Sequence, residues 1–165
     1  MKQRSPNYEA RLTNSGTPAA DLAGLDLSGK KLDRKPLSNA DLSGANLSDA
    51  DLSSSDLSGA NLSGANLTRT KLSGAGLFGA DLSGANLSNA DLSFANLGYA
   101  DLSNADLSGV KMVQSNMFQT NLSGAKLHGA YLEEVNLVGV NLSGVDIHQA
   151  RLSKVTMPDN SVFGL

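Results

Sequence analysis

The sequence predicts an all-β solenoid, in which the chain coils around a central stack of its own leucine side chains. Every fifth residue from Leu22 to Met157 is Leu, Met or Ile, which makes 28 consecutive positions in one register. The unit around each of these centres follows the pattern Ala-(Asp/Asn)-Leu-Ser-Gly. The composition agrees, because only 4% of the residues are aromatic and a stack of leucines needs few of them. A length of 165 residues suits a single domain.

A period of five excludes the two regular secondary structures. On an α-helix five residues advance by about 500°, so successive leucines would wind around the helix and would not form one apolar stripe. On a straight strand an odd period places alternate leucines on opposite faces. A bend in every unit removes the conflict, because it keeps all the leucines on the inner side of the chain.

Each unit is predicted to form a short extended side followed by a corner. In an extended stretch such as Ala40 to Leu42 the side chains alternate, so Ala and Leu point inward and Asp points outward. The next two residues, Ser43 and Gly44, turn the corner. A type II turn needs a positive φ at its third residue, which favours Gly or Asn. Of the 28 residues at this position, 13 are Gly and three are Asn.

Bulky residues occupy some of the corners. A positive φ is strained for a residue with a side chain, so we expect turns without positive φ there. The corners concerned are Arg69, Phe94, Tyr99, Gln114, Gln119, Glu134 and Lys154. The corners are therefore predicted to be of two kinds.

The units resemble the tandem A-(D/N)-L-x-x repeats of pentapeptide-repeat proteins, and the resemblance covers residues 20–159. It implies a right-handed quadrilateral β-helix with four units, or 20 residues, in each coil, and so about seven coils in this chain. It also implies that the centre and the small residue two positions before it point inward. With strands about 4.8 Å apart, the repeat would be a rod about 34 Å long.

Two segments flank the repeat. Residues 1–19 are predicted to be an N-terminal tail or a cap over the first coil, and residues 160–165 form a C-terminal end segment. In the first coil Lys30 and Lys35 replace the small inward residue, and we expect them to point out of a distorted coil because a buried charge needs a partner. Val162 continues the register as a further centre, so the β-helix is expected to stop without a separate cap.

The composition also excludes several functions. The chain contains no Cys, so nothing indicates disulfides, thiol catalysis or a Cys-based metal site. Its opening residues have no apolar stretch typical of a secretory signal, and no segment has the length of a transmembrane helix, so we expect a cytoplasmic protein without membrane contact. The serines and glycines belong to corners, and no His-Asp pair is placed to activate a serine. We therefore expect no enzymatic activity and no cofactor.

The middle of the chain is acidic, with two Lys or Arg against eight Asp or Glu in residues 37–110. Some proteins of the family that the chain resembles are proposed to imitate the DNA duplex and to occupy a type II topoisomerase through acidic faces. Here the aspartates are spread over all four sides, mostly at the habitual Asp/Asn position, which favours a solvated repeat surface. Direct nucleic-acid binding is not expected, because no basic stripe could neutralise phosphates.

Residues 20 positions apart are expected to stack in columns on one face of the coil. One column, which alternates in charge over its first five members, contains Lys31, Asp51, Lys71, Asp91, Lys111, Tyr131 and Arg151. Another contains Asp21, Asp41, Asn61, Asp81, Asp101, Asn121 and Asn141. The two histidines, His128 and His148, should lie one coil apart on one side, near Lys126 and Asp146. Such a group could bind a transition metal, but it offers no certain third ligand, so we expect no metal site.

An aromatic surface is the main candidate for binding. One side of the coil should gather Phe78 and Phe118 with the corner residues Phe94 and Tyr99, and with Val138 beyond them. A contiguous apolar patch on a monomer often marks an interface, and the alternative is that large side chains are tolerated at corners.

The C-terminal end is a second candidate surface. Val162, Phe163 and Leu165 could fold over the open end of the leucine stack as a lid, or two molecules could bury their ends against each other. We hypothesise a homodimer, formed through this end or through the aromatic side.

The sequence thus predicts a non-enzymatic protein-protein interaction or scaffold protein whose partner is unknown. The alternative is an acidic DNA mimic that binds a type II topoisomerase such as gyrase.

Overall fold

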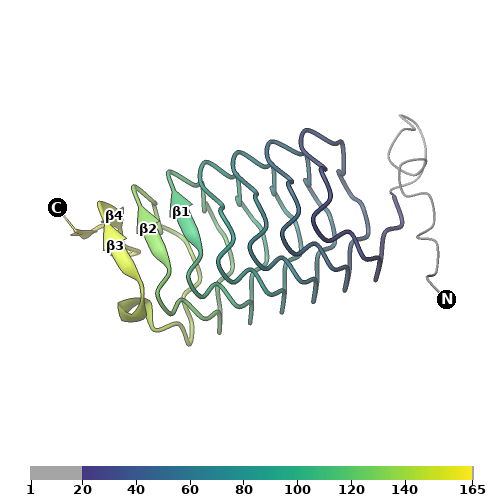
Figure 1. The fold of residues 1–165 in the computed structure, drawn as a ribbon. Helices are drawn as coiled ribbons and strands as arrows, with labels where there is room; N and C mark the ends of the chain where they lie inside the picture. Colours follow the sequence, from purple (N-terminus) through teal and green to yellow (C-terminus); the bar gives the residue numbers. More distant parts are fainter. Residues whose placement is uncertain (1–19, 165) are drawn as a thin grey trace.

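The chain forms a column of stacked coils in the computed structural model, which describes residues 20–164 (Figure 1). Residues at the outward Asp/Asn position pair in parallel with the residues 20 positions further on, beginning with Asp21 and Asp41 and ending with Asn136 and Thr156. Four five-residue units therefore make one coil, as expected. The predicted columns are confirmed by the same pairing, which joins the successive members of the Asp21 column up to Asn141.

Longer elements occur only near the C-terminal end of the described residues. Strands β1 (Lys111–Val113), β2 (Tyr131–Glu133) and β3 (Arg151–Ser153) form a parallel sheet in the order β1-β2-β3. A short 3-10 helix, η1 (Ile147–Gln149), precedes β3. Elsewhere along the column the pairing is limited to single bridges, because each extended side is followed at once by a turn.

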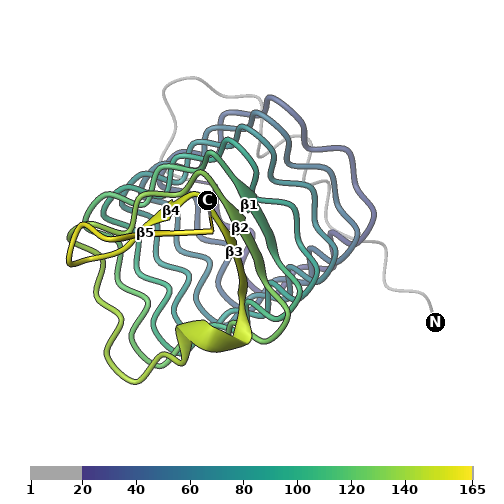
Figure 2. The same cartoon turned by 90° about the vertical axis from the view of Figure 1, so that its left-hand side faces the viewer.

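Strands β4 (Val155–Thr156) and β5 (Val162–Phe163) form an antiparallel pair at the C-terminal end of the column (Figure 2). Within this pair Val155 lies opposite Phe163 and Thr156 lies opposite Val162. The chain therefore reverses its direction after the last coil.

The core is a stack of inward-pointing centres with small residues between them. Each centre from Leu22 to Leu137 is at most 2% exposed. The small residues two positions before the centres are also buried, from Ala40 at 1% to Val140 at 7% exposed. These values confirm the inward register that was predicted for both positions.

The corners are type II turns at most units. The amide of the residue after the corner donates to the carbonyl of the centre, as from Ala45 to Leu42 at 3.0 Å. The residue between them, Gly44, has a φ of 61°. A positive φ at the third residue together with this hydrogen bond defines the type II turn that the Gly and Asn corners predicted.

The expectation that bulky corners avoid positive φ was wrong. Phe94 has a φ of 61°, and Tyr99 and Arg69 have values of 59° and 57°. Positive values also occur at Gln114, Gln119, Glu134 and Lys154. The reason is tertiary, because the corner amide donates to the next coil, as from Phe94 to the Val113 carbonyl at 2.8 Å. Stacking thus imposes a conformation that costs about 1–2 kcal/mol for a residue with a side chain.

Two kinds of corner do exist, but they differ in another respect. After β1, β2 and β3 the chain bends without the turn hydrogen bond that closes the other corners. The φ angle stays positive at these bends, at Gln114, Glu134 and Lys154. These bends therefore differ from the type II corners in hydrogen bonding and not in the sign of φ, whereas Gln149, the corner residue in η1, has no positive φ.

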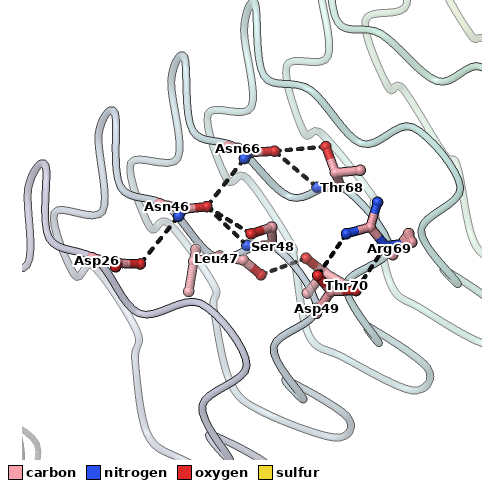
Figure 3. A network of polar contacts seen from close by, with 9 residues as sticks. All are labelled: Asp26, Asn46, Leu47, Ser48, Asp49, Asn66, Thr68, Arg69 and Thr70. Carbon is pink, nitrogen blue, oxygen red and sulfur yellow. Dashed lines mark hydrogen bonds and ion pairs between the residues drawn. The ribbon is translucent and has the colours of Figure 1, made fainter.

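Asparagine side chains connect successive coils at the outward position (Figure 3). Asn66 Nδ2 donates to Asn46 Oδ1 at 3.0 Å, and Asn46 Nδ2 donates to Asp26 Oδ1 at 3.1 Å. The Asn46 oxygen also accepts the Ser48 N–H at 3.2 Å. Asp and Asn both supply an oxygen to the following corner, and Asn can in addition donate to the previous coil. This dual role explains why these two residue types fill the position.

Hydroxyl and charged side chains also link the coils (Figure 3). Thr70, which replaces the usual Ala, is fully buried, and its Oγ1 donates to the Leu47 carbonyl at 2.8 Å. A buried hydroxyl is costly without a partner, and this bond supplies one. On the surface, Arg69 contacts both carboxylate oxygens of Asp49 at 2.7 Å. Such an exposed pair adds little to stability.

The first coil differs from the expectation. Lys30 and Lys35 are exposed, as predicted, but the coil is not distorted. Lys31 bridges Asp51 and Pro36 bridges Asp56 with the same spacing as in later coils. Because the second coil fixes the backbone of the first, only the two lysine side chains depart from the pattern. The predicted tail or cap of residues 1–19 lies outside the described residues.

The expected end of the β-helix was also wrong, because Val162 does not continue the repeat. A reverse turn follows Met157, in which the Asn160 N–H donates to the Met157 carbonyl at 2.9 Å and Asn160 has a φ of 64°. Val162 and Phe163 then form β5, which pairs with the backbone of β4. They therefore cover a strand edge that a chain ending without a cap would leave unpaired. Leu165 lies outside the described residues.

Candidate interaction surface

Three aromatic residues, Phe78, Tyr99 and Phe118, form what we call the aromatic ladder. The ring centroids of Phe78 and Tyr99 are 5.3 Å apart with an interplanar angle of 63°, and those of Tyr99 and Phe118 are 5.4 Å apart at 78°. These edge-to-face contacts are a favoured geometry for aromatic pairs. The rings remain 48%, 54% and 53% exposed, so the ladder presents contiguous apolar surface to solvent.

The repeat positions the ladder. Phe78 and Phe118 each follow a buried centre on the same side of the column, two coils apart, and Tyr99 stands at the corner of the coil between them. Gly98 takes the position in that middle coil that Phe78 and Phe118 occupy in theirs. A Cβ atom on Gly98 would lie 3.3 Å from Phe78 Cδ2, so the Phe78 ring rests close above the Gly98 backbone.

Sequence reasoning overlooked Gly98. A signal was present, because Gly98 is the one glycine that directly follows a centre, at a position where Ser is usual. A side chain at this position would press on the Phe78 ring. Because Gly98 has no side chain, the Phe78 ring can lie over the backbone of the next coil.

The other predicted surface residues are not part of the ring contacts, although Val138 takes the position of Phe118 in the next coil. Phe94 is 57% exposed, but within residues 20–164 its ring makes no contact with another aromatic ring. Val138 is half-buried. Val162 and Phe163, which are 51% and 47% exposed, belong to β5 at the C-terminal end and form a separate surface.

Amide side chains support the backbone beneath the ladder. Asn116 Nδ2 donates to Asn96 Oδ1 at 2.9 Å. The same Asn96 oxygen accepts the Gly98 N–H at 3.2 Å, and Asn116 Oδ1 accepts the Phe118 N–H at 3.1 Å. These bonds hold the residues that carry or underlie the rings in one arrangement. The backbone that carries the ladder is therefore held in place before any partner binds.

Carboxylates on the surface are engaged by the chain itself. Hydrogen bonds from Ser43 hold the pKa of Asp41 below its usual value, and Ser108 has the same effect on Asp106. The Asp51 pKa is also lowered, first by hydrogen bonds from Ser53 and then by nearby lysines of its column. These aspartates therefore serve the corners as well as giving the surface its charge.

A charged corner column continues from Phe94 toward the C-terminal end. Gln114 Nε2 donates to Glu134 Oε2 at 2.6 Å, and Lys154 Nζ lies 3.0 Å from Glu134 Oε1. Both neighbours favour the ionised carboxylate, Gln114 most, and so lower the Glu134 pKa. The positive charge of Lys154 is thus partly neutralised by Glu134.

The predicted alignment of the two histidines on one side of the column is shifted at His148. Gly109 N–H donates to the His128 carbonyl at 2.9 Å, but Gly129 N–H donates to the Gln149 carbonyl at 2.9 Å, so η1 shifts the register by one residue at His148. Asp146, which caps η1, accepts the His148 N–H at 3.1 Å. Among residues 20–164 no three His, Cys, Asp or Glu side chains gather as metal ligands.

The fold and the surface define a repeat solenoid that displays stacked side chains on a rigid column. The family model for pentapeptide repeats matches the chain in eight copies, over residues 19–59, 37–74, 75–114, 85–124 and 120–157. The chain therefore belongs to the pentapeptide-repeat family, whose members fold as right-handed quadrilateral β-helices. Among residues 20–164 no helix is long and apolar enough to cross a membrane.

Several solved structures are similar to this chain. HetL, which is involved in the regulation of heterocyst differentiation in the cyanobacterium Nostoc sp. strain PCC 7120, is 31% identical over 88% of this chain and 81% of its own, with a TM-score of 0.46. The pentapeptide-repeat protein alr5209 from Nostoc PCC 7120 is 36% identical over 66% of this chain and 84% of its own, with a TM-score of 0.50. QnrB1, a plasmid-mediated fluoroquinolone resistance protein, is 23% identical over 81% and 80% of the two chains, with a TM-score of 0.44. No curated protein matches the sequence.

Proposed function

We propose that this chain is a non-enzymatic interaction or scaffold protein, a rod of about seven coils that binds a protein partner through the aromatic ladder. The observation that carries the proposal is the contact between three aromatic rings that each remain about half exposed. Aromatic side chains are enriched at the points of an interface that contribute most to binding. The ladder is also held by main-chain pairing on both sides, so little ordering is needed when a partner binds.

A non-enzymatic role is supported by the use of the serine hydroxyls. Ser63 Oγ donates to Asn61 Oδ1 at 2.7 Å, and Ser55 Oγ donates to the Leu52 carbonyl at 2.7 Å. Both hydroxyls donate hydrogen bonds within the corners of the fold.

A cytoplasmic location is part of the same proposal, and fractionation of the native cell tests it.

Capture of partners from the native cell extract tests the proposal. The intact chain serves as bait beside a Phe78→Ser, Phe118→Ser double variant and a Phe94→Ser control. Phe94 is as exposed as the ladder residues but makes no ring contact with them. We expect a partner that the intact chain and the control retain and the double variant loses. An identical set of captured proteins for all three baits would contradict binding through the ladder.

The DNA mimic remains the second candidate, and the acidic charge of residues 37–110 favours it. Against it, asparagines interrupt the acidic columns, as Asn61 does between Asp41 and Asp81. A supercoiling assay with gyrase separates the two functions. Inhibition or protection of gyrase by micromolar protein would support the mimic, and the absence of any effect would support the scaffold.

Self-association through the C-terminal end is a further part of the proposal. The centres Leu142, Leu152 and Met157 are only partly buried, and Val162 and Phe163 are exposed beside them. A second molecule would remove this apolar surface from water. Light scattering should show a dimer for the intact chain and a monomer after deletion of residues 160–165. A dimer lost only in the Phe78→Ser, Phe118→Ser variant would place the contact on the ladder, and a monomeric intact chain at high micromolar concentration would exclude the homodimer.

A further inference from the structure

The spacing of the aromatic ladder matches the repeat of one kind of peptide. Phe78 and Phe118 occupy equivalent positions two coils apart. At about 4.8 Å per coil their backbones are separated by about 9.6 Å along the column. A polyproline II helix has three residues per turn and a rise of about 3.1 Å, so one turn measures about 9.3 Å. A polyproline II segment that lies along the column would therefore meet the two phenylalanines one turn apart.

The ring orientation favours such a peptide over a glycan. Sugar rings stack on flat aromatic faces, and a chain of sugars would need several faces in one plane. The Tyr99 ring makes angles of 63° and 78° with the Phe78 and Phe118 rings, so the ladder alternates faces and edges. Aromatic residues that alternate in this way are suited to the ridged surface of a polyproline II helix, which other domains bind through aromatic-lined surfaces.

Hydrogen-bond donors beside the ladder fit the same peptide. A polyproline II helix has no internal hydrogen bonds, so its carbonyl groups are free to accept. Within the described residues the Tyr99 hydroxyl, the Asn96 Nδ2 group and the Gln119 side-chain amide donate to no other residue. Asn96 and Gln119 are exposed. These groups can donate to the carbonyls of a bound segment without breaking a bond of the free protein.

The two flanks of the aromatic ladder differ in charge. The side that begins after the Tyr99 corner carries Asp81 and Asp101, which pair in parallel, the first exposed and the second half-buried. The side before the ladder carries Lys71, Asp91 and Lys111, whose charges alternate. A Lys or Arg at one end of the ligand would face the two carboxylates on the acidic flank.

We propose that the aromatic ladder binds a proline-rich segment in the polyproline II conformation that carries a basic residue at one end. Phe78 and Phe118 contact successive turns of the segment, Tyr99 separates the two contacts and donates its hydroxyl, and Asp81 and Asp101 face the basic residue. The inference rests on the proposed function, because it names the ligand class of the same surface.

Calorimetric titration of the intact chain tests the inference with defined probes. These are decaproline, decaproline preceded by two arginines, and a Gly-Ala peptide of equal length preceded by two arginines. We expect the arginine-decaproline peptide to bind, decaproline to bind more weakly, and the Gly-Ala peptide not to bind. Added salt should reduce the advantage of the arginines, because exposed charges are screened. No binding of either proline peptide at millimolar concentration would overturn the proposal.

Matched variants locate the binding on the ladder. Phe118→Ser should weaken binding of the arginine-decaproline peptide by about tenfold or more, as expected for a central aromatic contact. Phe94→Ser, an equally exposed phenylalanine on a neighbouring corner, should leave it unchanged. Circular dichroism confirms that each variant is folded. Equal binding by Phe118→Ser and the intact chain would overturn the proposal, and so would binding of cellohexaose in place of the peptides.

Failure of this inference differs from failure of the proposed function. If the peptides do not bind but the captured protein partner is still lost in the Phe78→Ser, Phe118→Ser variant, the ladder is an interface for another kind of ligand. If the variant also retains every captured protein, the proposed function is wrong as well.

Discussion

The middle and the C-terminal end of the column use the same repeat with different results. The centres from Leu42 to Leu107 are 0% exposed, whereas Leu142, Ile147 and Leu152 are only partly buried although they occupy the same position in the unit. In a solenoid each coil contacts mainly its two neighbours, so a coil near the end lacks half of its packing. The burial of a leucine here depends on the coils on both sides of it and not on its own unit.

The two regions also differ in how their backbones are paired. In the middle the Leu82 N–H donates to the Asp101 carbonyl at 2.7 Å and the Asp81 N–H donates to the Ala60 carbonyl at 3.0 Å, so each unit is bonded to the coils before and after it. At the end η1 replaces an extended side, and the antiparallel strand β5 takes the place of a further coil. The end is closed by local structures that the repeat does not encode.

The largest expected effect comes from truncating a leucine in each region. Leu82→Ala should lower the free energy of unfolding by about 2–5 kcal/mol, because it removes a fully buried side chain and leaves a cavity. Leu142→Ala should cost only about 1–2 kcal/mol, because that side chain is already partly exposed. Urea unfolding followed by circular dichroism measures both. Ser83→Ala serves as the control and should stay within about 0.5 kcal/mol, and equal costs at the two leucines would remove the contrast between the regions.

Glycines in the two regions should respond differently to an added methyl group. At Gly84, with a φ of 63°, a Cβ would meet no atom within 4 Å, so Gly84→Ala should cost only the strain of a positive φ, about 1–2 kcal/mol. At Gly164 a Cβ would overlap the Leu152 carbonyl oxygen and lie 2.8 Å from Ser153 Cα, so β5 must detach.

Amide exchange measures this difference. The Lys154 N–H donates to the Gly164 carbonyl at 2.8 Å, so it should lose protection in Gly164→Ala and keep it in Gly84→Ala. Retained protection in Gly164→Ala would show that β5 does not hold the end of the column closed.

A smaller contrast concerns two buried serines of one column. Ser55 Oγ donates to the Leu52 carbonyl at 2.7 Å, whereas Ser115 Oγ, near β1, has no partner among the described residues. Ser55→Ala should therefore cost about 1 kcal/mol, and Ser115→Ala should be neutral or stabilising because it removes an unsatisfied hydroxyl. Thermal unfolding of the two variants in parallel gives the comparison. A loss at Ser115 as large as that at Ser55 would mean that its hydroxyl is satisfied in solution.

The smallest expected effect is a decrease of the melting temperature at acid pH. The pKa values of Asp41, Asp49 and Asp51 are lowered from 3.8 by hydrogen bonds from Ser43, Arg69 and Ser53 respectively. A carboxyl with a lowered folded pKa stabilises the protein above its unfolded pKa, and this contribution is lost as the pH falls through the folded value. The melting temperature should thus decrease below about pH 4 and be flat between about pH 5 and 7. Asp49→Asn should reduce the decrease slightly, and a melting temperature that rises on acidification would contradict the assignment.

Much of the candidate surface follows from counting residues. Because residues 20 apart lie on successive coils, the sequence places Phe78, Tyr99 and Phe118 on neighbouring coils, and the ring contacts agree with that placement. It did not reveal the role of Gly98 or the angles between the rings. The ring angles and the contact over Gly98 depend on side-chain rotamers. Contacts between coils determine these rotamers, and the repeat pattern of the sequence does not encode them.

The sequence by itself determined the period and the inward register, because a bend in every unit lets an unbroken five-residue repeat bury every leucine. The columns followed from the coil of 20 residues that the resemblance to pentapeptide-repeat proteins implied. The tertiary structure alone decided the corners at Phe94 and Tyr99, where stacking imposes a positive φ that local preference opposes. It also decided the C-terminal end. Val162 fits the repeat by its position, but with no further coil to pair with, the chain turns back after Met157 and β5 satisfies the edge of β4 instead.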